Sequence, residues 1–506
     1  MLAKVISGAT VGLDSVPIEV EVDIAAQGLP AFNIVGLPDK AIEESKERVR
    51  SALKNVGADF PVKRITVNLA PADLPKEGPA YDLPIAIGIL IASGQLSADI
   101  SDSIFVGELS LDGNLRATSG ILPLALLARN KNFRRIFIPS LNAKEAAVVE
   151  GLATIPVENI IDLFHHLSGN KKIPPHPKIN IDLENSVSYD FDMKEIRGQE
   201  MAKRALEIAA AGGHNVLLKG PPGAGKTLLA RAFSSILPKL TLNEALEVTK
   251  IYSILGQVNP TDPIVRSRPF RTPHHSASAI GLIGGGTHPK PGEISLANRG
   301  VLFLDEFPEF PRHVLESLRG PLEDGVVTVS RASGSLSFPA KFTLIAASNP
   351  CPCGFLGDST KNCVCLPGQI ARYQKRLSGP ILDRIDLHVE VPAVKMEKLT
   401  GETDAEPSGN IRTRVQEARE IQITRFNKNP IGNNSEMSPK EIKIFCKLDA
   451  DSLNLLRAAI SKMQLSARSY HRVLKVARTI ADLERSKNIG TQHIAEALQY
   501  RVRIES

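Results

Sequence analysis

The chain has 506 residues, of which 42% are hydrophobic and 23% are charged, and its formal net charge is +6 at pH 7. A chain of this length can bury large cores and is expected to form about three domains, and it has no run of about 18 or more apolar residues, which excludes a membrane-spanning helix. The small excess of basic residues permits a polyanionic partner without requiring one, because such charges are often solvated surface.

Residues 1–170 carry a mixed α/β pattern. The opening stretch, MLAKVISGATVGLDSV, has no uninterrupted apolar run after its lysine, so no secretory signal is expected and we predict a cytoplasmic protein without a membrane partner. The segments RITVNLA and RIFIPS are typical of strands, whereas residues 41–56 and 83–93 are typical of helices. Residues 171–192 are rich in proline and polar side chains and are predicted to form a linker.

The strongest chemical signal follows a short apolar run at Val216–Leu218. A loop with the pattern G-x-x-x-x-G-K-[ST] leads from this run into an apolar-periodic helix, and it consists of Gly220, Pro221, Pro222, Gly223, Ala224, Gly225, Lys226 and Thr227. Glycines in such a loop let backbone N–H groups surround nucleotide phosphates at a helix N-terminus. Lys226 is expected to neutralise the β- and γ-phosphates, and the Thr227 hydroxyl to ligate Mg²⁺.

Two further apolar runs end in polar side chains that would complete this site. Val301–Leu304 is typical of a strand buried on both faces, and it is followed by Asp305 and Glu306. We expect Asp305 to hold the Mg²⁺ water shell and Glu306 to polarise the attacking water. The run FTLIAASNP ends near Asn349, whose uncharged amide could orient water against the γ-phosphate. Parallel strands present such side chains at one edge of the sheet.

Two insertions interrupt this nucleotide-binding pattern. Residues 270–297 precede the carboxylate strand, and residues 324–341 are predicted to form a β-hairpin with a turn at Gly334 and Ser335. The first insertion also carries His274 and His275. Adjacent histidines project differently, so we favour hydrogen-bonding or nucleotide-proximal roles for them over metal ligation.

Four of the five cysteines fall within residues 351–365, namely Cys351, Cys353, Cys363 and Cys365. Four thiolates in tetrahedral geometry suit Zn²⁺, and a reducing cytosol favours metal over disulfide. The pairs are spaced C-x-C and not the commoner C-x-x-C. A redox switch of neighbouring thiols and a set of unliganded structural cysteines are the two alternatives to the zinc site that we favour.

Together these motifs resemble the AAA+ ATPases. The residues that match the functional positions of that family are Ile196 beside the adenine, Lys226 in Walker A, Asp305 and Glu306 in Walker B, Asn349 at sensor 1, Arg384 at the arginine finger and Arg468 at sensor 2. Arg472 is a weaker alternative for sensor 2. The resemblance implies ATP and Mg²⁺ as cofactors and a homo-oligomer in which Arg384 reaches the nucleotide of a neighbouring subunit.

The two insertions resemble the helix-2 insert and pre-sensor-1 hairpin of the AAA+ branch that contains magnesium chelatases and MCM helicases. In ring-shaped members such hairpins point into the central pore. Lys290, Arg331 and Lys341 are therefore candidates for contacts with DNA phosphates. Solvated loop charge is nearly as good an explanation for each of them.

Two stretches of the N-terminal region, residues 71–90 and 105–139, resemble the proteolytic domain of Lon proteases, which has an S5-like fold. Where that domain has its nucleophilic serine this chain has Ala80, and where it has its lysine this chain has Leu122. Neither residue supplies a nucleophile or a base, so peptide hydrolysis through that dyad is excluded. A scaffold, a ring partner or a nucleic-acid surface with Lys63, Arg64, Arg134 and Arg135 remain as roles.

Over essentially its whole length the chain resembles the YifB/ComM family, which is magnesium chelatase-like. The resemblance implies a multidomain α/β fold with a Lon-like N-domain (1–170), a linker (171–192), an AAA+ core (193–395) with its cysteine insertion (351–365), and a helical C-terminal lid (396–506). It also implies a hexameric, ATP-driven DNA helicase that promotes branch migration in natural transformation, with recombination proteins as partners. A chelatase-type remodeller of a protein partner is the alternative.

Overall fold

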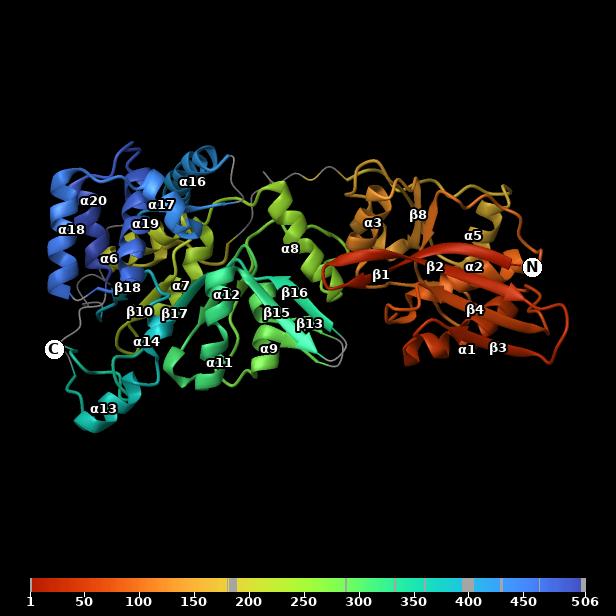
Figure 1. Ribbon diagram of the computed structural model, residues 1–506, viewed down its shortest axis with the longest axis horizontal. Coiled ribbons are helices and arrows are strands. Elements are labelled where there is room, and N and C mark those ends of the chain that lie inside the picture. Colours follow the sequence, from red (N-terminus) through yellow and green to blue (C-terminus); the bar gives the residue numbers. More distant parts are fainter. Residues whose placement is uncertain are drawn as a thin grey trace. The chain divides into compact units, whose positions relative to one another are not determined.

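The computed structural model describes residues 2–179, 181, 189–286, 289–331, 334–358, 361–393, 405–427, 431–463 and 465–501. The chain folds into two compact units (Figure 1). Unit 1 comprises Met1–Leu183 and Leu242–Val265, and unit 2 comprises Glu184–Thr241 and Arg266–Ser506. None of the described helices combines the length and the apolar character that crossing a membrane requires.

Unit 1 is built on a sheet with the strand order β1-β2-β4-β3 and a second sheet with the order β5-β8-β9. Its strands are β1 (Leu2–Val11), β2 (Asp14–Ile24), β3 (Ala31–Val35), β4 (Arg64–Ala70), β5 (Ser103–Phe105), β6 (Glu108–Leu109), β7 (Leu115–Arg116), β8 (Arg135–Pro139) and β9 (Ala153–Val157). Its helices are α1 (Lys40–Asn55), α2 (Asp82–Ala92), α3 (Ile121–Asn130), α4 (Ala143–Ala146), α5 (Ile160–Leu167) and α8 (Leu242–Ile254), with 3₁₀ turns η1 (Pro79–Tyr81) and η2 (Ser140–Asn142).

The core of unit 1 follows from simple periodicities. In β2, Ile18, Val20 and Val22 are buried while the intervening acidic residues lie on the other face, as expected for a strand with one face in the core. The helix α2 is buried along nearly all of its length and packs against β1 and β2. The predicted strands RITVNLA and RIFIPS are confirmed as β4 and β8, and the predicted helices 41–56 and 83–93 as α1 and α2.

Helix α8 belongs to unit 1, although the expected ATPase range 193–395 includes its residues. It packs against α3. The Ser253 carbonyl accepts a hydrogen bond from Gly120 N at 2.9 Å, and the Ser253 hydroxyl donates to Oε1 of the buried Glu145 at 2.5 Å. Apolar burial and these bonds together hold an excursion of the chain within unit 1, between two segments that belong to unit 2.

Unit 2 contains a parallel sheet with the strand order β11-β14-β17-β10-β18. These strands are β10 (Val216–Lys219), β11 (Phe270–Arg271), β14 (Val301–Leu304), β17 (Thr343–Ser348) and β18 (Leu387–Glu390). Because the strands are parallel, the carboxyl ends of β10, β14 and β17 lie along one edge. The predicted strands 216–218, 301–304 and 342–350 are confirmed in this sheet.

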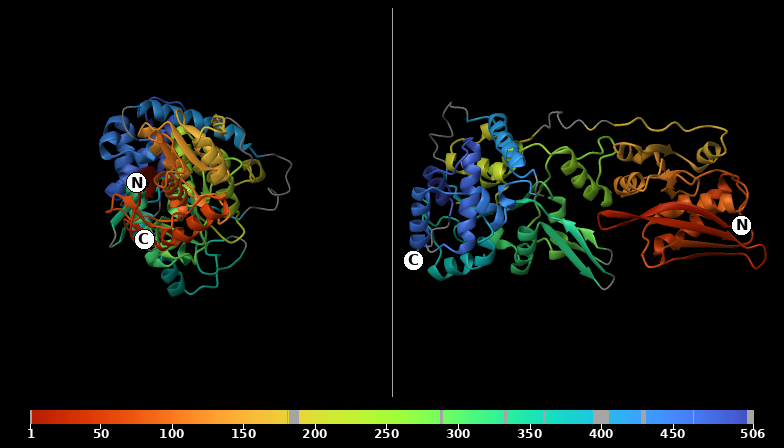
Figure 2. Two further views of the ribbon diagram at one scale, coloured as in Figure 1. Left: turned by 90° about the vertical axis from the view of Figure 1, so that its right-hand side faces the viewer. Right: turned by 45° about the horizontal axis from the view of Figure 1, so that its top comes forward.

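Helices and short turns surround this sheet in unit 2. Those before β18 are η3 (Met193–Glu195), α6 (Glu200–Gly212), α7 (Lys226–Phe233), η4 (Ser234–Ile236), α9 (Ala279–Ile283), α10 (Glu293–Leu296), η5 (Phe307–Glu309), α11 (Arg312–Ser317), α12 (Arg319–Asp324), α13 (Pro367–Gln374) and α14 (Gly379–Leu382). The C-terminal set, which gathers on one side of unit 2 (Figures 1 and 2), is α16 (Ser408–Arg425), η6 (Asn434–Glu436), α17 (Pro439–Phe445), α18 (Ala450–Met463), α19 (Ala467–Leu483) and α20 (Thr491–Gln499).

Both insertions contain antiparallel strand pairs. The first pairs β12 (Gly284–Gly285) with β13 (Lys290–Pro291), and the second pairs β15 (Val326–Arg331) with β16 (Gly334–Pro339), so the predicted hairpin is confirmed. The hairpin β15–β16 extends from the body of unit 2 (Figure 2). The predicted turn at Gly334 and Ser335 is wrong, because these residues pair with Arg331 and Ser330 inside the ladder. The connection falls on residues 332–333, outside the described residues.

Candidate active site

The phosphate loop lies between the end of β10 and the start of α7. Gly223 and Gly225 have φ values of +77° and +87°, a left-handed conformation that glycine adopts without strain. A Cβ at Gly220 would lie 2.0 Å from the Val391 carbonyl oxygen, so the loop passes close to the chain that follows β18. The loop therefore favours glycine at three positions, and the sequence pattern specifies two of them, Gly220 and Gly225.

The side chain of Lys226 ties the phosphate loop to β17. Its Nζ donates to the carbonyl oxygens of Gly220 at 2.6 Å and Pro221 at 2.8 Å, and to Oδ1 of Asn349 at 3.1 Å. Burial lowers the pKa of Lys226, and the charge of Asp305 opposes that shift. The lysine predicted to bind phosphates and the amide predicted to orient water thus lie in direct contact.

The two predicted Mg²⁺ ligands also meet. The Thr227 hydroxyl donates to Oδ2 of Asp305 at 2.8 Å, and Oδ1 of Asp305 accepts from the backbone N–H of Glu306 at 2.9 Å. Thr227 is the second residue of α7, the helix after β10, and Asp305 directly follows β14, with β17 between those two strands. A hydroxyl and a carboxylate held together at a sheet edge are the oxygen donors that Mg²⁺ prefers, so the residues present fit this ion.

Glu306 has an unusual backbone and an unexpected partner. Its φ of +50° is rare for a residue other than glycine, and its side chain is 56% exposed. His275 Nδ1 lies 3.1 Å from Oε2 of Glu306. His275 comes shortly after β11, the strand that pairs with β14. The sequence favoured a polar role for this histidine but could not identify the carboxylate, since the contact depends on the pairing of two strands.

The predicted adenine-side residue Ile196 is buried in the core of unit 2 directly after η3. Close to it, Gln199 has a φ of +59°, and its Nε2 donates to the carbonyl oxygens of Ala224 at 3.2 Å and Pro392 at 2.6 Å. Gln199 therefore fastens the segment around Ile196 to the phosphate loop. Nothing in the local pattern distinguishes this glutamine, and it is not among the site residues predicted from the sequence.

The predicted arginine finger, Arg384, is buried against a carboxylate of its own chain. Its side chain is 4% exposed, and Nη2 lies 2.6 Å from Oε1 of Glu323 on α12. Arg468 is 60% exposed and approaches the same oxygen at 3.9 Å. Arg472, the weaker sensor candidate, donates instead to the Arg384 carbonyl at 3.1 Å and pairs with the buried Asp386. The structure thus brings Arg384 and Arg468 together on one carboxylate.

Asp386 anchors this arginine cluster. Burial opposes its ionisation, yet Arg472 and His214 hold the pKa of Asp386 far below its usual range. Its backbone N–H donates to the Asn215 carbonyl next to β10 at 3.0 Å. A buried and ionised carboxylate therefore joins α19 to the start of the strand that leads into the phosphate loop.

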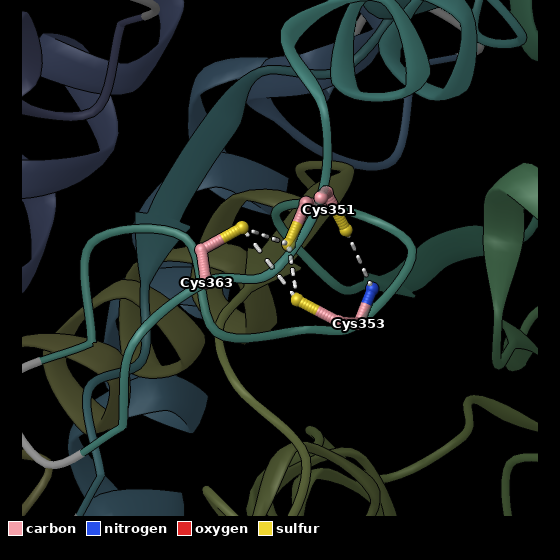
Figure 3. Close-up of side chains that lie close together, drawn as sticks. Cys351, Cys353 and Cys363 are labelled. Atoms are coloured by element: carbon pink, nitrogen blue, oxygen red, sulfur yellow. Dashed lines mark hydrogen bonds between the residues drawn. The ribbon is translucent and has the colours of Figure 1, made fainter.

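Cys351, Cys353 and Cys363 point their sulfur atoms toward one another (Figure 3). With Cys365 included, all four Sγ atoms lie within 4.8 Å of each other. The Cys351–Cys353, Cys353–Cys363 and Cys351–Cys363 Sγ distances are 3.4, 3.6 and 3.7 Å. Sulfur ligands of a tetrahedral Zn²⁺ stand ~3.8 Å apart, given a Zn–S bond of ~2.3 Å, whereas a disulfide needs ~2.05 Å. The cysteines are free and their spacing fits zinc.

The cysteine loop packs directly on the nucleotide site. Gly354 is buried and has a φ of +88°, and a Cβ there would lie 2.4 Å from Cδ of Pro222 and 3.8 Å from Cγ of Asn349. Backbone N–H groups of Phe355 and Val364 lower the pKa of the Cys353 thiol to about 6. A tight loop of this kind presents amides to sulfur on one side and contacts the phosphate loop on the other.

The three residues suggested for DNA contact have different settings. Lys290 is exposed in β13. Lys341 follows the second strand of the hairpin, and its Nζ lies 3.3 Å from Oε2 of Glu436. The backbone of Arg331 ends β15, and its side chain lies outside the described residues.

In unit 1, the two positions of the Lon-like dyad hold no catalytic group. Ala80 lies in η1, and its carbonyl accepts from Gly107 N at 2.9 Å. Leu122 is fully buried, and its backbone N–H donates to Oε1 of Glu145 at 2.9 Å. Of the basic residues considered there, Lys63, Arg64 and Arg134 are exposed, whereas Arg135 Nε donates to Asp102 at 3.0 Å.

Comparisons with known proteins agree with this architecture. Residues 192–399 match the family model "Magnesium chelatase, subunit ChlI", residues 20–142 match "Subunit ChlI of Mg-chelatase", and residues 405–501 match "Magnesium chelatase, subunit ChlI C-terminal". The competence protein ComM of Haemophilus influenzae is 47% identical over 511 residues, which cover 99% of this chain and 98% of that protein. YifB of Escherichia coli is 44% identical, with 99% and 97% covered.

A more distant relative is the magnesium-chelatase 38 kDa subunit of Rhodobacter capsulatus, which is 25% identical over 346 residues, covering 62% of this chain and 88% of that subunit. The full-length similarity to ComM and YifB is much stronger than this partial one. The chain combines an N-terminal ChlI-like domain, a chelatase-type AAA+ core around a parallel sheet and a helical C-terminal domain. It therefore belongs to the YifB/ComM family of magnesium chelatase-like AAA+ ATPases.

Proposed function

We propose that the chain is an ATP-driven DNA motor that promotes branch migration at DNA junctions during the integration of incoming DNA. The observation that carries this proposal is the meeting of Lys226, Asn349 and the Thr227–Asp305 pair at one sheet edge, in a chain related over its full length to a competence protein. The ATPase residues supply the energy source, and the relative supports DNA as the substrate.

In the proposed cycle each residue at the sheet edge has one task. The backbone N–H groups of residues 223–225 and the Lys226 ammonium bind the phosphates. Thr227 and Asp305 would hold Mg²⁺, which when bound neutralises charge on the phosphates. Glu306 exchanges its contact with His275 for one with the attacking water and accepts a hydrogen bond from that water. The Asn349 amide orients the same water.

Oligomeric assembly completes the proposed site. Arg384 and Arg468 are proposed to stabilise the charge that develops on the phosphates, Arg384 from a neighbouring subunit. Because Arg384 is buried against Glu323 within its own chain, it must leave that carboxylate before it can reach another subunit. We therefore propose that Arg384 leaves Glu323 and contacts phosphate when neighbouring subunits close on ATP. The proposed oligomer is a ring of six subunits.

The cysteine cluster is proposed to hold one structural Zn²⁺ through Cys351, Cys353, Cys363 and Cys365. Bound zinc would crosslink a loop that carries little apolar core of its own. Since Gly354 of this loop touches Pro222, a rigid loop would in turn support the shape of the phosphate loop. The sulfur spacing supports this assignment over a redox pair of thiols.

We assign the other parts of the chain as follows. The N-terminal region is proposed to be a Lon-like, S5-type domain without peptidase activity, because Ala80 and Leu122 occupy the dyad positions. The two hairpin insertions are proposed as the helix-2 insert and pre-sensor-1 hairpin, with Lys290, Arg331 and Lys341 as candidates for DNA contact. The protein is proposed to act in the cytoplasm with recombination proteins as partners.

A remodeller of a protein partner is the second candidate function. The partial similarity to a magnesium-chelatase subunit favours it, since the same ATPase residues would serve either substrate. Steady-state ATPase rates with and without four-way-junction DNA distinguish the two. We expect junction DNA to stimulate hydrolysis and to be unwound, and Lys226→Ala to abolish both. An oligomer that neither responds to the junction nor unwinds it would count against the DNA motor.

A further inference from the structure

A basic cavity lies beside the nucleotide site in unit 2. Its volume is about 490 Å³, and its lining includes Arg312, Arg372, Lys375 and Arg376, together with Glu309 and Phe310. Glu309 and Phe310 belong to the segment directly after Glu306. Arg372 lies on α13, and Lys375 and Arg376 directly follow that helix. None of the roles proposed above uses this cavity.

The charges of the cavity are unbalanced. Arg376 Nη1 contacts Oε2 of Glu309, the one acidic residue in the lining. Arg372 and Lys375 are exposed, and neither has a carboxylate within ion-pairing distance among the described residues. Residues 366–382 contain three basic residues and no aspartate or glutamate. A solvated basic face is the ordinary explanation for such residues, but here the cations converge on a hollow, which concentrates their potential.

The other face of α13 contacts the nucleotide site. Tyr373 is buried, and burial raises the pKa of Tyr373 to about 12, an effect that the nearby backbone N–H of Asn349 opposes. Gln374 Nε2 donates to the Pro350 carbonyl at 3.4 Å. One helix therefore carries cavity cations on its exposed side and holds the segment of Asn349 on its buried side.

The setting favours a nucleic-acid strand over a free phosphate ion. The cavity is open at the surface, and α13 begins beside two exposed apolar side chains, Val364 at 82% and Leu366 at 67%. Cations contact the backbone of a strand, while exposed apolar groups contact its sugars and bases. An isolated phosphate ion would gain nothing from these apolar neighbours.

We propose that this cavity binds the phosphodiester backbone of a DNA strand through Arg312, Arg372 and Lys375, and so reports DNA binding to Glu306 and Asn349. This inference rests on the proposed function and names a DNA-binding surface of the same motor, separate from the two hairpins. A DNA strand in the cavity would contact two segments of the lining. One of them, residues 308–312, follows Glu306, and the other belongs to the helix that carries Tyr373.

The test is the salt dependence of DNA binding by the full-length chain, measured by fluorescence anisotropy with a labelled single-stranded oligonucleotide. Each lost phosphate contact lowers the slope of log K against log salt by about 0.7 for single strands, so Arg372→Gln/Lys375→Gln should lower it by about 1.4. The corresponding loss of affinity near physiological salt is on the order of tenfold.

Two matched variants separate charge from other effects. Arg372→Lys/Lys375→Arg keeps both charges and should retain the slope of the unaltered chain. Arg457→Gln/Lys462→Gln removes two exposed charges from α18, away from the cavity lining, and should also retain it. An unchanged slope in Arg372→Gln/Lys375→Gln would overturn the cavity assignment. The assignment would also be overturned if that variant lost the oligomer while each subunit kept its affinity for DNA.

Junction unwinding by the unaltered chain is measured in parallel, so that the two ideas fail separately. Unwinding that persists with an unchanged slope refutes the cavity but keeps the motor. DNA binding that depends on Arg372 and Lys375 without unwinding keeps the cavity and refutes the helicase. Inorganic phosphate that displaces DNA beyond the effect of chloride at equal ionic strength would overturn the strand in favour of a free-phosphate site.

Discussion

Gly354 offers the sharpest test of the contact between the cysteine loop and the phosphate loop. Its φ is +88°, and a Cβ added there would lie 2.4 Å from Cδ of Pro222. Gly354→Ala therefore forces either the cysteine loop or the proline ring to move. Gly357 in the same loop has a φ of +77° but no atom within 4 Å of such a Cβ, so Gly357→Ala carries the backbone strain alone.

The expected size of the effect follows from these two positions. The left-handed backbone costs an alanine about 1–2 kcal/mol at either site. Only at Gly354 does overpacking add a further term of about 1–3 kcal/mol, because the ring of Pro222 cannot rotate away. If this strain displaces the phosphate loop, the Kd for ATP rises by about 5- to 150-fold, since about 1.4 kcal/mol corresponds to a factor of ten.

The assay is a titration of each variant with a fluorescent ATP analogue, together with the zinc content of the same preparations. Gly354→Ala should bind the analogue more weakly than Gly357→Ala, and Gly357→Ala should bind it as the unaltered chain does. Equal and undiminished affinity in both variants, with the metal content unchanged, would refute the reasoning that strain at Gly354 reaches the nucleotide.

Four further substitutions test the proposed roles. Glu306→Gln should retain ATP binding while kcat falls by about 10²- to 10⁴-fold, because the carboxylate that polarises the attacking water is lost. A tenfold weaker affinity for ATP would contradict this role. Arg384→Ala should keep the oligomer, as measured by light scattering, and should lower kcat by about 10³-fold or more. Glu323→Gln should release Arg384 and therefore raise kcat. Its control is Glu316→Gln, which removes a carboxylate that pairs with Arg319 instead. Full activity of a monomeric Arg384→Ala chain would exclude action between subunits. Cys351→Ser should lower zinc, measured by mass spectrometry, from about one ion per chain toward none, and unaltered chain without zinc would remove the metal proposal.

Local sequence patterns were sufficient where chemistry depends on neighbours in the chain. The phosphate loop is contiguous, so its glycines and Lys226 could be identified directly. Asp305 and Asn349 could be placed near it because parallel strands end at one edge, and the structure puts them in contact with Thr227 and Lys226. The cysteine cluster was equally accessible, since its four members lie within one short segment.

Contacts between distant segments were not accessible in this way. No local pattern in residues 242–254 indicates that Ser253 bonds to Glu145 in unit 1. The hairpin turn was misplaced because Gly334 is a turn residue by propensity. Its register is set instead by the alternation that buries Val327, Val329 and Phe338, and a shift of one residue would expose that face.

The position of Glu323 shows why the partner of Arg384 matters more than the arginine itself. Glu323 stands near the end of α12, and β15 of the hairpin begins at Val326. The Arg384 side chain bonds to that carboxylate, and the Arg384 carbonyl accepts from Arg472 of α19. If a neighbouring nucleotide draws Arg384 away, Glu323 at the base of the hairpin loses the closer of its two arginines in the same step, since Arg468 lies 3.9 Å from it. Arg384, which is proposed to contact ATP of a neighbouring subunit, would then also loosen the β15–β16 hairpin proposed to contact DNA. This ion pair alone would be sufficient to connect hydrolysis to movement of the hairpin.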